Sequence, residues 1–155
     1  MPRSWSFSDA IPVPAPVRSR DEALELLFAF VQRPLRAETW CIPLDDDGVG
    51  GLAVAVNDTV DADTVLDVVR SCANAIAETQ FGAMFVATVR PDHDLYADDD
   101  DRWLAACDIA ADHDVELLDW IVIGPGGSHF PSDLVEAVRR WPGEGQGPRW
   151  FRSSP

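Results

Sequence analysis

Two short, strongly apolar segments constrain the fold of this chain more than any other feature. Residues Ala83 to Val89 are almost continuously apolar, and a second, longer apolar segment runs from Val115 to Ile123. Segments of this length and composition are typical of strands that are covered on both faces. Between them, apolar residues recur at helical spacing, namely Trp103, Leu104, Cys107, Ala110 and Ala111. A strand, a helix and a second strand in this order predict an α/β domain whose central mixed sheet is flanked by helices in three layers.

The preceding part of the chain supplies further helices and strands to this sheet. Ser19 followed by Glu22 is a capping-box pattern, and it predicts a helix from Arg20 to Gln32, before Pro34. Acidic residues and Gly48 form a turn signal between two β-rich segments, which are Thr39 to Leu44 and Leu52 to Val56. A second helix is expected from Asp61 to about Gln80, because apolar residues there recur at helical spacing. Arg90 precedes Pro91 and is therefore expected to end a strand.

Both ends of the chain differ in composition from its middle. Prolines alternate through residues 1–17, and we expect an extended arm there because proline lacks a backbone donor. Residues 18–141 form the predicted domain, and Ser132 is expected to cap a terminal helix that holds Leu134, Val135 and Val138. Residues 142–155 are rich in glycine and proline, which predicts a flexible tail.

Composition excludes several classes of function. The chain has 27 acidic and 12 basic residues, so its net charge of −15 disfavours binding to nucleic acid. All the basic residues are arginine, which excludes Schiff-base chemistry on a lysine. Three widely spaced cysteines form no CxxC pair, which favours a reducing cytoplasm. No apolar run approaches the roughly 20 residues of a membrane helix, so we expect no membrane association.

The polar residues of the middle of the chain form no recognised metal motif. Asp98 to Asp101 follow Asp92 and Asp94, but they lack the spacing of a calcium-binding loop. Acidic residues are favoured at a helix N-terminus by the helix dipole, so a solvated helix start is the expected interpretation. The alternative is a metal site that uses His93, Asp94, Asp98 or Asp101.

The segment Glu116 to Gly124 reads Glu-Leu-Leu-Asp-Trp-Ile-Val-Ile-Gly. It resembles the Leu-Leu-Asp-His-Ile-Ile-Ile-Gly strand of the RadC-like branch of the JAB/MPN (JAMM) domain, with Trp120 in place of histidine. The resemblance extends over about 110 residues, from the first helix to Phe130. It implies a three-layer fold similar to that of cytidine deaminases and an ancestral zinc metallopeptidase chemistry.

One strand earlier, the same family carries His-x-His-Pro-Ser-Gly-Asp-Pro-x-Pro-Ser-x-x-Asp. Aligned without gaps on residues 88–101, this pattern retains Pro91, Asp94 and Asp101, whereas Thr88 and Arg90 stand at the two histidine positions. Glu38 resembles the family's glutamate, which implies the position of its general base.

Zinc needs ligands with a free lone pair, and this alignment supplies few. A threonine hydroxyl is a poor zinc ligand and a guanidinium has no lone pair to donate. We therefore expect a catalytically inactive RadC/JAMM-like domain without a cofactor, in which Arg90 replaces the metal charge and pairs with Glu38 or Asp101. Arg90, Asp94 and Trp120 are candidate binding residues.

Two functions follow from these expectations. The first is a protein-binding or scaffolding module, with a protein partner or a second copy of the chain as its ligand. The alternative is a metal-dependent hydrolase of the peptidase or isopeptidase type with a relocated metal site.

Overall fold

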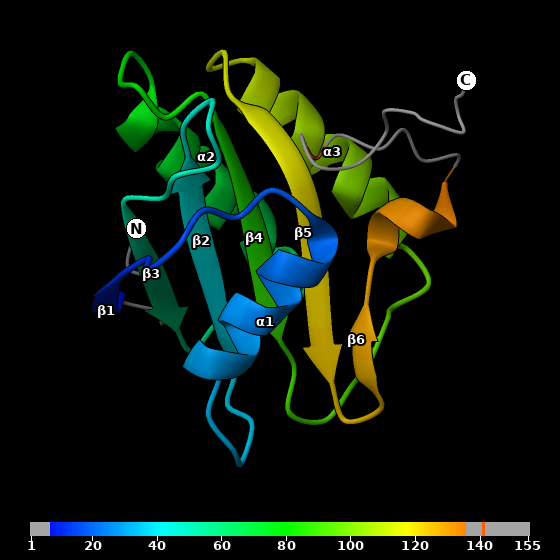
Figure 1. Cartoon of the computed structure of the whole chain (residues 1–155). Coiled ribbons are helices and arrows are strands. Elements are labelled where there is room, and N and C mark those ends of the chain that lie inside the picture. The colour runs from blue at the N-terminus through cyan, green and yellow to red at the C-terminus, as the bar shows by residue number, and fades with distance from the viewer. Residues whose placement is uncertain (1–6, 136–140, 142–155) are drawn as a thin grey trace, which may run out of the picture.

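Six strands form one mixed sheet, and helices cover both of its faces (Figure 1). The computed structural model describes residues 7–135 and residue 141. In chain order the elements are β1 (Phe7–Pro12), α1 (Arg20–Phe30), β2 (Glu38–Leu44), β3 (Leu52–Asn57), α2 (Thr64–Ile76), β4 (Ala83–Val89), α3 (Asp99–Ala111), β5 (Glu116–Gly124), β6 (Gly127–His129) and a 3₁₀ turn, η1 (Pro131–Leu134).

The strand order across the sheet is β1-β3-β2-β4-β5-β6. β4 and β5 are parallel and are joined by the α3 crossover, whereas the other neighbouring strands are antiparallel. The carboxyl ends of β4 and β5 therefore lie at the same edge of the sheet, where the chain turns towards the start of α3. Parallel strands commonly place binding residues at this edge.

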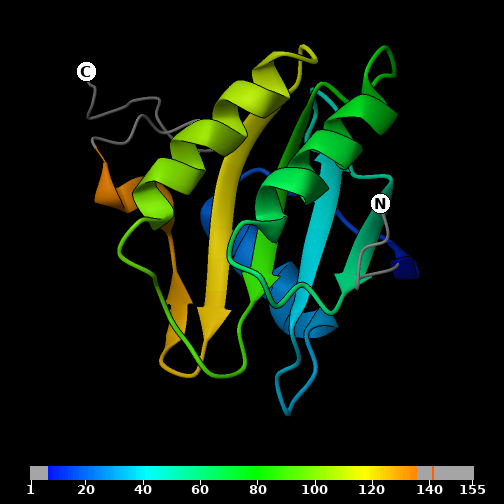
Figure 2. The same cartoon turned by 180° about the vertical axis from the view of Figure 1, so that it is seen from behind.

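The sheet separates two apolar cores, which confirms the predicted three-layer α/β architecture. α1 lies on one face (Figure 1), and α2 and α3 lie side by side on the other (Figure 2). Side chains alternate between the faces along each strand. Trp40 and Phe85 belong to the core beneath α1, whereas Cys41, Met84 and Val86 belong to the core beneath α2 and α3.

Side-chain hydrogen bonds fix the start of α1. The Glu22 N–H donates to Ser19 Oγ at 3.2 Å, which confirms the predicted cap of α1, and the Glu22 carboxylate accepts the Arg18 N–H at 2.7 Å. α2 and α3 have 13 residues each. Within the described ranges, no helix is both long enough and apolar enough to cross a lipid bilayer.

A buried carboxylate on β5 holds the α1 side of the domain together. Asp119 is 1% exposed, and it accepts hydrogen bonds from Arg20 Nε at 2.9 Å, from Ser132 Oγ at 3.1 Å and from Trp141 Nε1 at 3.2 Å. The Trp141 ring also packs on Phe85, with 5.2 Å between the ring centroids. These contacts join α1, β5 and η1 to a residue close to the C-terminal end of the domain.

The proline-rich segment differs from its prediction, because Phe7–Pro12 forms strand β1 at the edge of the sheet. Its backbone pairs with β3 from Phe7↔Val56 to Pro12↔Leu52. An edge strand needs backbone donors on one side only, so a proline is tolerated at its end. The chain stays attached beyond the strand, where the Val17 N–H donates to the Gly48 carbonyl at 2.8 Å.

Of the predicted terminal helix, the described residues include the short 3₁₀ turn η1, in which Ser132 is buried and bonded to Asp119. Val138 and the predicted tail of residues 142–155 lie outside the described residues.

Removal of β1 tests its structural role. We compare a chain that lacks residues 1–12 with one that lacks residues 1–6, so that the difference isolates Phe7–Pro12. The longer truncation is expected to lower the free energy of unfolding by about 2 kcal/mol more, because β3 loses its outer hydrogen-bonding partner and partly buried Ile11 is removed. Urea unfolding followed by circular dichroism measures the difference, and identical midpoints would contradict it.

Candidate functional site

The carboxyl end of β4 carries a buried arginine, Arg90. The Arg90 backbone N–H donates to the Ile123 carbonyl at 2.8 Å, which continues the pairing of β4 with β5 beyond the strand end. Pro91 keeps Arg90 extended, so its side chain follows the strand alternation onto the face covered by α2 and α3. Only 7% of the residue is exposed.

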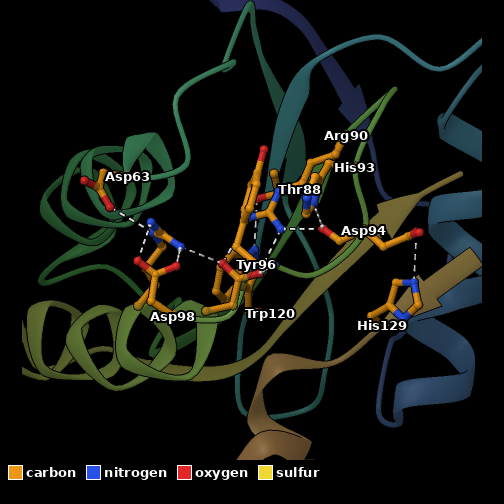
Figure 3. Close-up of polar contacts among 11 residues, drawn as sticks. Asp63, Thr88, Arg90, His93, Asp94, Tyr96, Asp98, Trp120 and His129 are labelled. Carbon is orange, nitrogen blue, oxygen red and sulfur yellow. Dashed lines mark hydrogen bonds and ion pairs between the residues drawn. The ribbon is translucent and has the colours of Figure 1, made fainter. Parts of the chain in front are cut away.

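Arg90 forms a two-pronged ion pair with Asp99 at the start of α3. Arg90 Nη1 donates to Asp99 Oδ2 at 2.8 Å and Nη2 donates to Oδ1 at 3.1 Å, while Nη1 also donates to the Asp94 carbonyl at 2.8 Å (Figure 3). Such parallel bonds fix both the distance and the orientation of the partners. The pair therefore ties the end of β4 to the first residue of α3.

Asp99 is 0% exposed and accepts hydrogen bonds from three residues. Besides Arg90, these are Arg102 Nη1 at 3.0 Å and the Tyr96 N–H at 2.7 Å. Burial by itself raises the pKa of Asp99, but the hydrogen bonds from Arg90 and Tyr96 and the charge of Arg90 outweigh it and hold the pKa below the ordinary range. Asp99 is therefore an ionised carboxylate at neutral pH.

A second arginine closes the cluster on its outer side. Arg102 donates to Asp63 Oδ1 at 2.8 Å and to Asp98 Oδ1 at 2.6 Å, in addition to its bond to Asp99. Burial lowers the pKa of Arg102, but these three aspartates outweigh that effect and raise the pKa above its ordinary range. The contacts link the start of α2 to the first turn of α3.

Aromatic rings fill the space around the Arg90 guanidinium. Its Cζ atom lies 4.4 Å from the centre of the Tyr96 ring and 5.7 Å from that of the Trp120 ring, distances suited to cation–π contact. Trp120 Nε1 donates to the Thr88 hydroxyl at 2.9 Å, and His93 stacks on the outer side of Tyr96. We call the set of Thr88, Arg90, Tyr96, Asp99, Arg102 and Trp120 the Arg90 cluster.

Asp94 holds the loop after β4 against the β5–β6 hairpin. Its Oδ1 accepts the Gly126 N–H at 2.9 Å and lies 3.1 Å from His129 Nε2 (Figure 3). The Gly126 hydrogen bond is the main cause that lowers the pKa of Asp94, and with His129 it outweighs the opposing effect of burial. A side chain at Gly124 would collide with this carboxylate, which explains the glycine there.

Three of the predicted site residues therefore meet, and two do not. Thr88, Arg90 and Trp120 belong to one cluster, to which Asp94 contributes its backbone carbonyl. The predicted pairing of Arg90 with Glu38 or Asp101 is wrong, because the partner is Asp99. Asp101 is exposed, since a residue two positions along a helix points roughly 200° away from Asp99.

Glu38 lies on the opposite face of the sheet from Thr88. It accepts a hydrogen bond from Trp40 Nε1 at 2.9 Å and lines a small cavity beneath α1 with Phe30 and Arg36. Because side chains alternate along β2, Glu38 shares the face of Trp40, whereas Thr39 shares the face of Cys41. The resemblance correctly placed Glu38 beside the end of β4, where it pairs with Val89. The side chain, however, lies on the face of the sheet opposite to Thr88 and Arg90.

The expectation that the whole run Asp98 to Asp101 is solvated is wrong for Asp99, which is buried. The spacing of apolar residues along α3 could have indicated this burial. Asp99 lies four residues before Trp103 and seven before Ala106, so it belongs to the buried stripe of α3. No sequence pattern indicated that Arg102 and Tyr96 would bind Asp99, because these contacts depend on the path of the loop between β4 and α3.

The cluster lacks the donors that a zinc site requires. The guanidinium of Arg90 has no lone pair, and Asp99 already accepts bonds from three partners. The alternative ligands do not converge either: Asp98 is bound to Arg102, Asp94 to the hairpin, and Asp101 points to solvent. Over residues 7–135 and 141, no group of three or more His, Cys, Asp or Glu side chains is arranged to hold a metal ion.

Comparison with models of known protein families gives no match to this chain, and comparison with curated proteins gives none either.

Loss of Arg90 tests the strength of the cluster. Arg90→Ala is expected to lower the free energy of unfolding by about 3 to 5 kcal/mol, because Asp99 would remain buried without its main partner. Arg70→Ala is the matched control, since Arg70 is 56% exposed and pairs with Asp67 on the surface of α2. The control should change stability by about 0.5 kcal/mol or less. Equal effects of the two variants in urea unfolding would contradict a structural role for the cluster.

The lowered pKa of Asp99 predicts a dependence of stability on pH. A carboxyl group whose pKa is lower when folded stabilises the protein fully above its unfolded pKa of about 3.9 and loses this contribution as pH falls through the folded value. The stability difference between the native chain and Asp99→Asn should therefore be large at pH 7 and shrink below about pH 4. Denaturant unfolding at a series of pH values measures it, and a constant difference down to pH 2.5 would count against the assignment.

Proposed function

We propose that this chain is a non-catalytic domain of the JAB/MPN type, similar to the RadC-like branch, that acts by binding another protein. The observation that carries the proposal is the Arg90–Asp99 ion pair, which stands where the resemblance places a metal ion. Thr88 and Arg90 lie at the end of the central strand β4, beside the start of α3. The resemblance implies this position for the two histidine ligands of the JAB/MPN family. A fixed positive charge and two aromatic rings fill that position here.

Two further features support the loss of catalysis. Activation of water needs a carboxylate with a free lone pair close to the reacting centre. The buried carboxylate nearest to Arg90 is Asp99, whose oxygens are occupied by three donors. Glu38, the residue implied as general base, faces the opposite core.

The chemistry of the surface indicates the kind of partner. A net charge of −15 repels nucleic acid and favours a partner with a basic surface. Several large apolar side chains are also exposed among the described residues, including Phe28 at 58%, Val60 at 77% and Leu104 at 49%. Apolar contacts surrounded by acidic residues suit a protein partner better than a small polar ligand.

The metal content of the chain tests the first half of the proposal. Protein purified without a metal-affinity tag is expected to carry no stoichiometric zinc at its JAB/MPN-type position and to hydrolyse neither peptide nor isopeptide substrates. Elemental analysis and a hydrolysis assay with added zinc measure both properties. One equivalent of zinc together with zinc-dependent hydrolysis would overturn the proposal in favour of a metallohydrolase with a relocated site.

Restoration of histidine tests the alignment itself. The double variant Thr88→His, Arg90→His should gain zinc affinity, because both side chains lie on the same face of the sheet and Arg90 is bonded to Asp99. The matched control is Thr88→His, Val89→His, which places the second imidazole in the core beneath α1. Isothermal titration with zinc compares them, and equal affinities would refute the correspondence with the family's ligands.

The salt dependence of complex formation tests the second half. A partner captured by the full chain at low ionic strength should be lost as salt rises from about 0.05 to 0.5 M, because screening weakens contacts between an acidic and a basic surface. Sedimentation of the purified chain distinguishes a partner from self-association. A complex that is indifferent to salt would contradict the proposed basic partner.

A further inference from the structure

A half-open apolar cavity lies between α2 and the sheet, away from the elements that build the Arg90 cluster. It has a volume of about 130 Å³ and is lined by residues of β2, β3 and α2. These are Cys41, Pro43, Val54, Ser71, Cys72, Ala75 and Ile76. Two of the three cysteines of the chain thus face one small cavity, although 31 positions of sequence separate them.

Three sulfur-bearing side chains gather at or beside this cavity. Cys41 and Cys72 both line it, and interaction with Cys72 is the main cause that raises the pKa of the Cys41 thiol. Cys41 Sγ also lies 3.7 Å from Met84 Sδ, which reaches it from the neighbouring strand β4. Sulfur–metal bonds of about 2.3 Å hold two ligand sulfurs of one ion roughly 3.7 to 4.0 Å apart, so the spacing of the Cys41 and Met84 sulfurs matches shared coordination.

We propose that Cys41, Cys72 and Met84 form a binding site for a soft monovalent metal ion of the Cu(I) class. Thiolate and thioether sulfur are the ligands that Cu(I) prefers. Zinc is a poorer match, because structural zinc takes four nitrogen or thiolate ligands and this site offers two thiols with one thioether. The rest of the lining is apolar apart from Ser71, which suits an ion of low charge.

Binding of Cu(I) at this site requires no oxidant or reductant. Cu(I) replaces the proton of each thiol that binds as thiolate, the proton passes to solvent, and copper keeps its oxidation state. With both cysteines bound as thiolates, two protons leave for solvent and the copper site carries a net charge of −1, in a cavity that opens to solvent beside Cys72. Interaction with Cys72 and then burial raise the pKa of Cys41, so that residue is protonated in the metal-free chain.

The site also has an entry route. Cys41 and Met84 are buried, whereas Cys72 is half-buried and the adjacent Ser71 and Ala75 are exposed on α2. An ion would meet Cys72 first and then reach Cys41, whose sulfur is in contact with Met84. A buried ligand pair reached through a more exposed thiol permits exchange with a carrier in solution.

Competition for copper tests the proposal on the full, reduced chain under anaerobic conditions. Cu(I) is supplied as its complex with bicinchoninate, whose colour is lost when the protein takes the ion. We expect uptake of one equivalent by the native chain. Cys41→Ala and Cys72→Ala should each weaken the affinity about 100-fold, and Met84→Leu about tenfold, because a thioether is the weaker ligand.

The matched control is Cys107→Ala, which removes the remaining cysteine, on α3 and outside the cavity lining. It should bind copper as the native chain does. Absence of uptake, or uptake that survives both Cys41→Ala and Cys72→Ala, would overturn the proposal.

Two measurements keep the test decisive if Cys41→Ala fails to fold. Cys72→Ala changes a half-buried position on a helix, and circular dichroism reports whether its fold is intact. Copper-edge X-ray absorption of the loaded native chain should show sulfur neighbours only. Nitrogen or oxygen neighbours in the first shell would refute the three-sulfur site.

Discussion

The pairing of Arg90 with Asp99 is the constraint on which the arrangement of β4, α3 and the loop between them depends. A buried carboxylate is stable only if donors replace the water it loses, and Asp99 finds three. Arg90 supplies two of the bonds, and its direction is set by the strand end before Pro91. Because Arg102 extends the network to Asp63, the same carboxylate also joins the starts of α2 and α3. The ion pair thus fixes the edge of the sheet at which β4 and β5 end.

The space at the end of β4, beside the start of α3, is filled by a positive charge. Arg90 supplies this charge, and the Tyr96 and Trp120 rings cover it. Asp119 shows the same solution on the opposite face, where Arg20, Ser132 and Trp141 satisfy a second buried carboxylate. Each outer layer is therefore joined to the sheet by one buried carboxylate as well as by apolar packing.

The proposed thiol site uses a different part of the same framework. Cys41 alternates towards α2 because it lies one residue after Trp40, which faces α1. Helical spacing brings Cys72 onto the buried side of α2 above it, and Met84 comes from the adjacent strand. Protein binding through the acidic surface and metal binding through these sulfurs involve separate residues, so one can be lost without the other.

The sequence by itself determined helices α1 to α3, strands β2 to β5 and the two helix-covered faces of the sheet, because local periodicity and turn residues report directly on which face a side chain takes. It also placed Thr88 and Arg90 on one face of the sheet, since strand alternation is regular. Only the tertiary structure decided that Asp99 rather than Asp101 meets Arg90, that Glu38 faces away, and that a proline-rich segment forms β1. These outcomes depend on the phase of a helix against its neighbours, on strand register and on a partner strand distant in sequence, and no local pattern encodes such relations.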